Sequence, residues 1–151
     1  MRTIWGLLLM DEKRILSLLD GLGRYYKELE KHIPKGEKDY QKNIEKKRFT
    51  ERTLQLLIET CIDVCQCLVR DLKLGLPTEE EGFFDKLHEA HVISEEMSLK
   101  LKDMKKFRNV LIHKYVEIDD SLVYDHATKE RKDFIDFKKE ILEFLKEQKK
   151  K

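Results

Sequence analysis

The chain of 151 residues has few of the residues that interrupt helices, with only 6 glycines and 2 prolines. A β-sandwich needs many turns built from these residues, so the composition argues against that class and favours long helices. The chain also has no large excess of positive or negative charge, because 31 Lys and Arg residues offset 30 Asp and Glu residues and leave a formal net charge of +1. The sequence therefore argues against a protein that binds nucleic acid over its whole surface, while a local basic patch is still allowed.

Cysteine is scarce and clustered. Cys61, Cys65 and Cys67 lie in one short stretch, and an odd number of cysteines in such a cluster does not match a secreted disulfide framework. We therefore expect a location in the reducing cytoplasm. Cys61 and Cys65 also fall on an apolar helical stripe, which predicts small core residues rather than zinc ligands.

Long apolar runs are missing as well. The longest, residues 4–10 (IWGLLLM), is far shorter than the roughly 20 residues that cross a bilayer, so we expect no membrane association. A helical pattern begins directly after Met10. We interpret residues 1–10 as an N-terminal extension and residues 11–151 as a single helical domain.

What the chain does have is a repeated helical pattern. Apolar side chains recur at intervals of three and four residues along four long segments, the spacing of one face of an α-helix. These segments cover approximately residues 11–33, 40–73, 94–113 and 119–151. A short helix is expected to begin at Thr78, because Thr78 and Glu81 fit a capping box. The predicted fold is all-α, an up-and-down bundle of four long helices and one short helix.

One polar segment stands out, residues 107–115, which read FRNVLIHKY. Helix geometry places Asn109 and His113 on one face, with Arg108 about 100° round from Asn109. His113 is expected near a helix C-terminus, where the helix dipole favours a protonated imidazole. Without a metal, these side chains suit cleavage of RNA by its own 2′-hydroxyl, which needs a base, an acid and a cation, and a two-fold dimer brings two of each to one cleft. By spacing alone, a helix-terminal histidine beside an arginine in a surface ion pair is the simpler interpretation.

Two other charged groups allow two interpretations each. The basic stretch within residues 42–48 either contacts phosphates or forms a solvated helix face, since acidic residues are interleaved with it. Glu59 and Asp63 form an acidic pair four residues apart. Asp63 either orients Arg108 or His113, or belongs with Glu59 to a stripe that faces solvent.

Residues 108–115 resemble the R-x4-H-x-Y signature of the HepT-like branch of the HEPN superfamily, the ribonuclease toxins of type VII HEPN/MNT toxin–antitoxin systems. The resemblance extends beyond the signature. Segments within residues 51–63, 75–94 and 116–124 are similar to the family's second helix, to the connection to its motif helix and to the exit from that helix, in the same order. The resemblance therefore covers the chain from about residue 11 to the last helix.

The resemblance implies an all-α HEPN-like fold, a homodimer, and metal-independent cleavage of an RNA substrate at a composite site in the dimer interface, without a cofactor. It implies that Arg108 and His113 are the catalytic residues, with His113 as acid and base and Arg108 holding the scissile phosphate, while Asn109 orients them. Tyr115 matches the tyrosine that a nucleotidyltransferase antitoxin modifies with AMP. Such a modification adds bulk and negative charge beside the cleft and repels an RNA phosphate.

Two other functions are compatible with the sequence. The first is a non-catalytic helical module that binds a minimal nucleotidyltransferase, which needs the same dimer but no ribonuclease chemistry. The second is a bare structural bundle, which predicts that Arg108 and His113 lie far from any cleft.

Overall fold

The computed structural model describes residues 11–113 and 117–150. Within these ranges the regular structure is entirely helical, which confirms the predicted all-α class. The helices are α2 (Glu12–His32), α3 (Glu37–Lys42), α4 (Ile44–Asp71), α5 (Glu80–Glu89), α6 (Glu95–Ile112), α7 (Asp120–Ala127) and α8 (Lys132–Lys149). None of these helices is long and apolar enough to cross a membrane.

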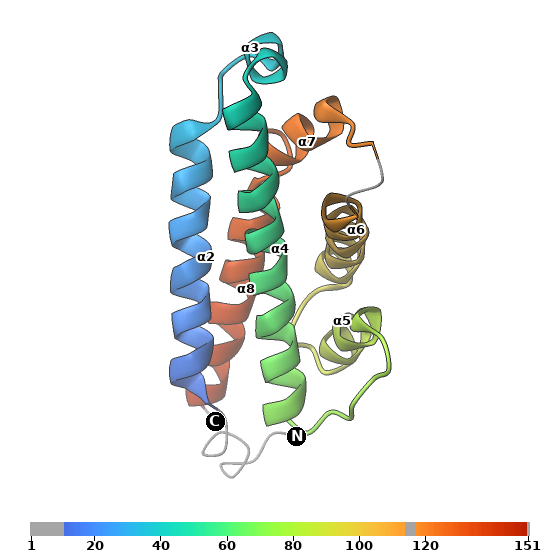
Figure 1. Cartoon of the computed structure of the whole chain (residues 1–151). Coiled ribbons are helices and arrows are strands. Elements are labelled where there is room, and N and C mark those ends of the chain that lie inside the picture. Colours follow the sequence, from blue (N-terminus) through green and yellow to red (C-terminus); the bar gives the residue numbers. More distant parts are fainter. Residues whose placement is uncertain (1–10, 114–116, 151) are drawn as a thin grey trace.

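The four long helices α2, α4, α6 and α8 run alternately up and down, as the sequence predicts (Figure 1). The central helix is α4, whose 28 residues extend about 42 Å at 1.5 Å per residue. It contacts each of the other six helices of the described ranges, and it packs most closely against α2 and α6. The buried side chains of α4 are therefore packed against several neighbouring helices.

The structure has three short helices where the sequence predicts one. The expected helix over residues 40–73 is divided at Asn43, whose extended backbone and side-chain oxygen cap the start of α4 by accepting from the N–H of Lys46. The expected last helix is divided at Thr128, whose hydroxyl donates to the carbonyl of Tyr124 over 2.7 Å and ends α7. In both places a short polar side chain bonds to the backbone and competes with the helical hydrogen-bond pattern.

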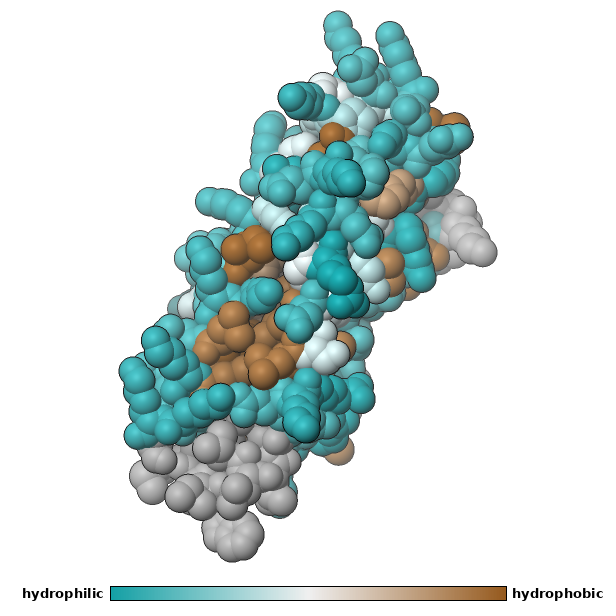
Figure 2. All heavy atoms as spheres, turned by 90° about the vertical axis from the view of Figure 1, so that its left-hand side faces the viewer, coloured by the Kyte–Doolittle hydropathy of each residue, from teal (hydrophilic) through white to brown (hydrophobic). Residues whose placement is uncertain are grey.

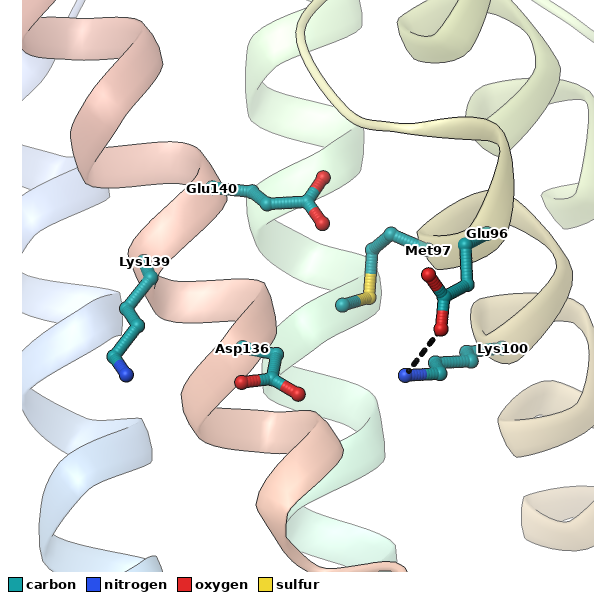
Figure 3. Close-up of a pocket in the computed structure, with 6 residues that line it drawn as sticks. All are labelled: Glu96, Met97, Lys100, Asp136, Lys139 and Glu140. Carbon is teal, nitrogen blue, oxygen red and sulfur yellow. Dashed lines mark ion pairs between the residues drawn. The ribbon is translucent and has the colours of Figure 1, made fainter.

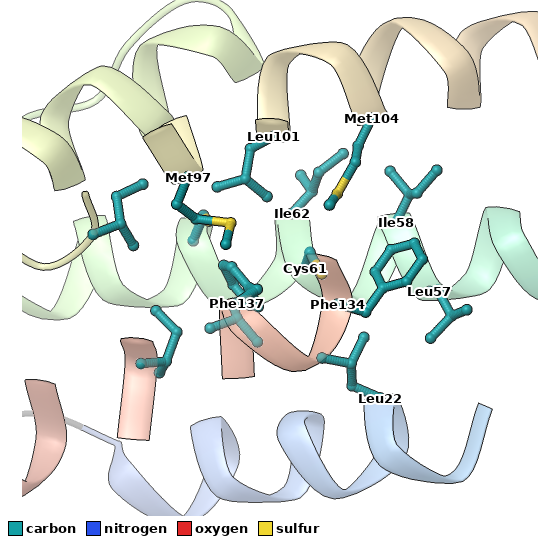
Figure 4. Close-up of a cluster of buried hydrophobic side chains, with 14 of the residues drawn as sticks. Leu22, Leu57, Ile58, Cys61, Ile62, Met97, Leu101, Met104, Phe134 and Phe137 are labelled. Atoms are coloured by element: carbon teal, nitrogen blue, oxygen red, sulfur yellow. The ribbon is translucent and has the colours of Figure 1, made fainter. Parts of the chain in front are cut away.

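The hydrophobic core lies between the four long helices. In Figure 4, Phe134 and Phe137 of α8 lie between Leu22 of α2 and the apolar face of α4, with Met104 of α6 on the other side. The aromatic ring of Phe137 is fully buried. The core therefore includes the last helix of the chain as well as the helix that carries the polar segment.

The three cysteines are part of this core. Cys61, Cys65 and Cys67 are buried and free of disulfides, as the sequence predicts for the first two. Burial raises the pKa of Cys61 and Cys65 above the ordinary value for a thiol. Both side chains are therefore neutral, weakly reactive packing groups.

The surface is mostly hydrophilic, with local apolar exposure. Figure 2 shows an apolar area among hydrophilic side chains on the side of α2. Leu16 of α2 and Leu142 of α8 are each 38% exposed. The two helices run antiparallel, and ion pairs join their ends, Lys149 with Glu12 and Arg131 with Glu30.

Candidate active site

Arg108 occupies the last turns of α6, and its side chain is only 12% exposed. Its Nε donates to Oδ1 of Asn109 over 3.0 Å, and its Nη2 forms an ion pair with Oε1 of Glu80. A guanidinium presents its donors in a rigid planar fork, so two acceptors on neighbouring nitrogens fix its plane. The side chains of Arg108 and Asn109 are therefore bonded to each other, and the orienting role of Asn109 stays a prediction.

Glu80 is a site residue that sequence reasoning missed. It is the first residue of α5, and its side chain is 29% exposed. The predicted capping box at Thr78 does not form, because the N-cap is Glu79 and no side-chain cap bond is made there. The sequence signal for Glu80 is the run of three acidic residues at the start of the helix. That run predicts helix capping, and it does not by itself predict a partner for Arg108.

The position of Glu80 depends on a close contact within the turn that precedes α5. A Cβ atom at Gly82 would lie 2.3 Å from Cβ of Pro77, closer than real contacts allow. Glycine at this position lets Pro77 pack directly against the first turn of α5. Further along α5, Asp85 forms an ion pair of 2.7 Å with Lys102 of α6. These contacts hold α5 alongside α6, with Glu80 opposite Arg108.

Asp63 lies on α4 within the electrostatic field of this cluster. Its carboxyl is exposed, yet its pKa is raised, chiefly by partial burial and then by the negative charge of Glu59. The cations of Arg14 and Arg108 act in the opposite direction and lower this pKa. Asp63 therefore faces solvent, as the interpretation of a solvent-facing stripe expects. Its charge also interacts with that of Arg108, and the orienting role stays a prediction.

His113 is the C-cap of α6, at the helix C-terminus as predicted, and its backbone N–H donates to the carbonyl of Val110 over 3.3 Å. Its side chain is exposed. The structure thus brings Arg108, Asn109 and His113 to the same end of one helix, with Arg108 sheltered and His113 accessible. Tyr115 lies outside the described residues.

The end of α6 is also held from the side by α7. The rings of Phe107 and His126 stack with their centroids 3.9 Å apart and their planes 16° from parallel. The start of α7 is fixed in turn, because Asp120 forms an ion pair of 3.1 Å with Lys47, and the Ser121 hydroxyl donates to Glu37 over 2.9 Å. Part of the basic stretch within residues 42–48 is therefore used to dock α7.

A separate hollow of about 300 Å³ lies between the start of α6 and α8 (Figure 3). It is lined by Glu96, Met97, Lys100, Asp136, Lys139 and Glu140. The ammonium of Lys100 bridges Glu96 at 3.2 Å and Asp133 at 3.1 Å. Lining charges of both signs, already paired in part, give this hollow no evident preference for an anionic substrate. Arg108 and His113 do not line it.

A family model described as "Ribonuclease HepT-like" matches residues 22–141 of the chain. The chain belongs to this family. The match begins within α2 and continues through α6 and α7 to α8, so it covers the helices that build the candidate site.

Two curated relatives of this HepT-like chain are nucleases by name. The tRNA nuclease HepT of Aphanizomenon flos-aquae is 29% identical over 110 residues, which are 73% of this chain and 75% of the relative. The mRNA nuclease HepT of Shewanella oneidensis is 32% identical over 84 residues, which are 56% of this chain and 63% of the relative.

A solved structure supports the fold of the HepT-like chain. The tri-AMPylated Shewanella oneidensis HEPN toxin, in complex with MNT antitoxin, superposes with a TM-score of 0.79 at 24% identity. The alignment covers 84% of this chain and 95% of that chain. The HEPN-like fold expected from the sequence is thereby confirmed.

The site of this HepT-like chain offers a cation and hydrogen-bond donors. Among residues 11–113 and 117–150, no group of three or more His, Cys, Asp or Glu side chains is arranged to hold a metal ion. Arg108 supplies a fixed positive charge, and His113 supplies an imidazole, whose ring nitrogens can accept or donate a proton. This combination suits the binding and proton-transfer steps of a reaction at a phosphodiester.

Proposed function

We propose that this HepT-like chain is a metal-independent endoribonuclease toxin, with Arg108 and His113 as its catalytic residues. The observation that carries the proposal is the sheltered, doubly anchored guanidinium of Arg108 on the helix that His113 caps, in a chain of the Ribonuclease HepT-like family. The nuclease names of the two curated relatives support the reaction class. The proposed substrate is RNA, without commitment to one RNA class.

The proposed reaction is attack of a ribose 2′-oxygen on the adjacent phosphorus. One imidazole accepts the 2′-hydroxyl proton while the 2′-oxygen forms its bond to phosphorus. Arg108 stabilises the negative charge that accumulates on the phosphoryl oxygens. The bond from phosphorus to the 5′-oxygen then breaks, and that oxygen takes a proton from a second imidazole, leaving a 2′,3′-cyclic phosphate and a 5′-hydroxyl. A two-fold homodimer supplies the second imidazole as another copy of His113.

The test compares wild-type protein with Arg108→Ala and His113→Ala. Wild-type expression is expected to arrest growth, and purified wild-type protein is expected to cleave RNA equally well with and without EDTA. Each variant is expected to lose about 100-fold or more of the cleavage rate, because a positioned acid–base group and a group that stabilises the charge of the transition state each contribute roughly that much. Light scattering is expected to give a dimer for all three proteins.

His88→Ala is the matched control, since His88 lies on α5 and is not part of the cluster around Arg108. It is expected to cleave RNA at the wild-type rate. If the wild-type chain instead forms a stoichiometric complex with a minimal nucleotidyltransferase but leaves RNA intact, the non-catalytic binding module replaces the nuclease proposal.

Neutralisation is proposed to occur by transfer of AMP to Tyr115, two residues after His113. The phenol oxygen loses its proton and bonds to the α-phosphorus of ATP, and pyrophosphate leaves. The solved complex of a tri-AMPylated HEPN toxin with MNT antitoxin supports this type of control. After coexpression with a minimal nucleotidyltransferase, the chain is expected to gain mass in whole AMP units and to lose RNA cleavage. Tyr115→Phe is expected to keep its unmodified mass, and a full mass gain in that variant would place the modification elsewhere.

A further inference from the structure

We propose that Glu80 is a positioning residue of the nuclease site, which holds the guanidinium of Arg108 in the orientation that a scissile phosphate requires. This proposal rests on the proposed ribonuclease function and adds a residue outside the R-x4-H-x-Y segment to its site. It also makes the short helix α5 a necessary part of the site.

The two contacts of Arg108 leave hydrogen-bond donors for a substrate. Asn109 accepts from Nε, and Glu80 accepts from Nη2, so each contact uses one donor of a side chain that has five. Both hydrogens of Nη1 and the second hydrogen of Nη2 are not used by these two contacts. Glu80 and Asn109 therefore set the plane of the guanidinium while its other edge can still donate two parallel hydrogen bonds to a phosphate.

Glu80 is itself well anchored. It lies in the first turn of α5, where the helix dipole stabilises a carboxylate. The tight contact of Pro77 with Gly82 fixes this turn from behind. Farther along the helix, Phe84 and Leu87 are fully buried in the core. Because Glu80 belongs to a fixed helix turn, its carboxylate can hold the guanidinium of Arg108 in one position. An exposed ion pair between two mobile side chains would not do so.

Asp63 is a second carboxylate whose charge acts on Arg108. The guanidinium is close enough to Asp63 to lower its pKa, and Asp63 belongs to α4 rather than to α5. Loss of the Glu80 carboxylate leaves Arg108 near a carboxylate on a different helix. The guanidinium is then expected to turn toward α4, away from the geometry that Asn109 and Glu80 define together.

The experiment measures kcat and KM for cleavage of a short RNA by wild type, Glu80→Ala and Glu80→Gln in the full chain. Binding of the same RNA with a 2′-deoxy nucleotide at the cleavage position is measured in parallel. Glu80→Ala is expected to lower kcat at least tenfold while KM and binding change less than threefold. Glu80→Gln keeps an oxygen that accepts from Arg108, so it is expected to recover kcat to within about threefold of wild type.

Glu79→Ala is the matched control, because Glu79 is the exposed neighbour and its loss changes the net charge equally. It is expected to leave kcat unchanged, which separates positioning from a general gain in positive charge. Thermal unfolding is followed for all variants, and a structural defect alone predicts that Glu80→Gln loses activity in step with its stability.

Two outcomes overturn the proposal while leaving the nuclease function intact. In the first, Glu80→Ala cleaves RNA as fast as wild type or faster, although Arg108→Ala is inactive. In the second, Glu79→Ala and Glu80→Ala lose activity equally. If wild-type protein itself does not cleave RNA, the positioning role falls with the proposed function, and NMR of the Arg108 Nε–H in wild type and Glu80→Ala still reports whether the carboxylate holds the guanidinium.

Discussion

His126 is a partly buried, titratable side chain in direct contact with α6. Its ring stacks on Phe107, its Nδ1 lies 3.3 Å from Oε2 of Glu130, and its side chain is 18% exposed. Burial lowers its pKa below the ordinary value of 6.5, and this effect outweighs the opposing influence of nearby carboxylates. Those carboxylates come from α7, the turn after it, α8 and α6, and they are Asp125, Glu130, Asp133 and Asp103. The folded state therefore favours the neutral ring.

This burial predicts a loss of stability in mild acid. As pH falls below about 6.5, the imidazole of the unfolded chain takes up a proton before that of the folded chain, so the free energy of unfolding decreases. His126→Phe keeps a ring on Phe107 and removes the titration. Urea unfolding measured between pH 7.5 and pH 5.5 (about one unit either side of 6.5) is expected to show a shallower decline for this variant. His88→Gln is the control, and an identical decline in wild type and His126→Phe would contradict the assignment.

The start of helix α5 is constrained by the close contact between Pro77 and Gly82. In an ordinary helix interior, replacing glycine by alanine stabilises the protein by about 1 kcal/mol. At position 82 the new Cβ meets Pro77 at 2.3 Å, so the turn or the helix has to move. Gly82→Ala is expected to lower the free energy of unfolding by about 1–3 kcal/mol, the usual range for overpacking. It is also expected to reduce RNA cleavage, since Glu80 is displaced with the first turn.

Gly21→Ala provides the matched control for that prediction. A Cβ at Gly21 in α2 would lie 3.6 Å from the side chain of Arg24, an ordinary contact. This variant is expected to be as stable as wild type or more stable, with unchanged cleavage. Urea denaturation and the RNA assay check both variants, and a Gly82→Ala protein as stable as Gly21→Ala would show that Pro77 does not constrain α5.

Apolar spacing predicts elements well when one stripe continues along the whole helix. It located the four long helices and the burial of Cys61 and Cys65 correctly, because each stripe is continuous. It did not detect the breaks at Asn43 and Thr128, because apolar residues on both sides keep a helical spacing while the polar side chain bonds locally to the backbone. At each break, a single polar side chain forms a hydrogen bond to the nearby backbone and interrupts the helix, although the apolar spacing continues.

The sequence predicts the part of the candidate site that lies on one helix, but it could not predict the part that comes from another helix. Arg108, Asn109 and His113 are neighbours along the chain, so helix geometry alone places them at one helix end. Glu80 reaches Arg108 only because α5 docks against both α4 and α6, and such a contact depends on the packed fold. The catalytic roles of these residues and that of Asp63 stay predictions until the variants are measured.

The close approach of Pro77 to Gly82 has a genetic consequence. A HepT-like nuclease whose cation is held by a carboxylate from another helix can be inactivated by substitutions that leave the signature segment intact. Bacteria that survive expression of this gene are therefore expected to carry changes at position 82 as well as at positions 108 and 113. By the same reasoning, a gene that keeps the R-x4-H-x-Y signature but has a bulky residue at position 82 is expected to encode an inactive protein.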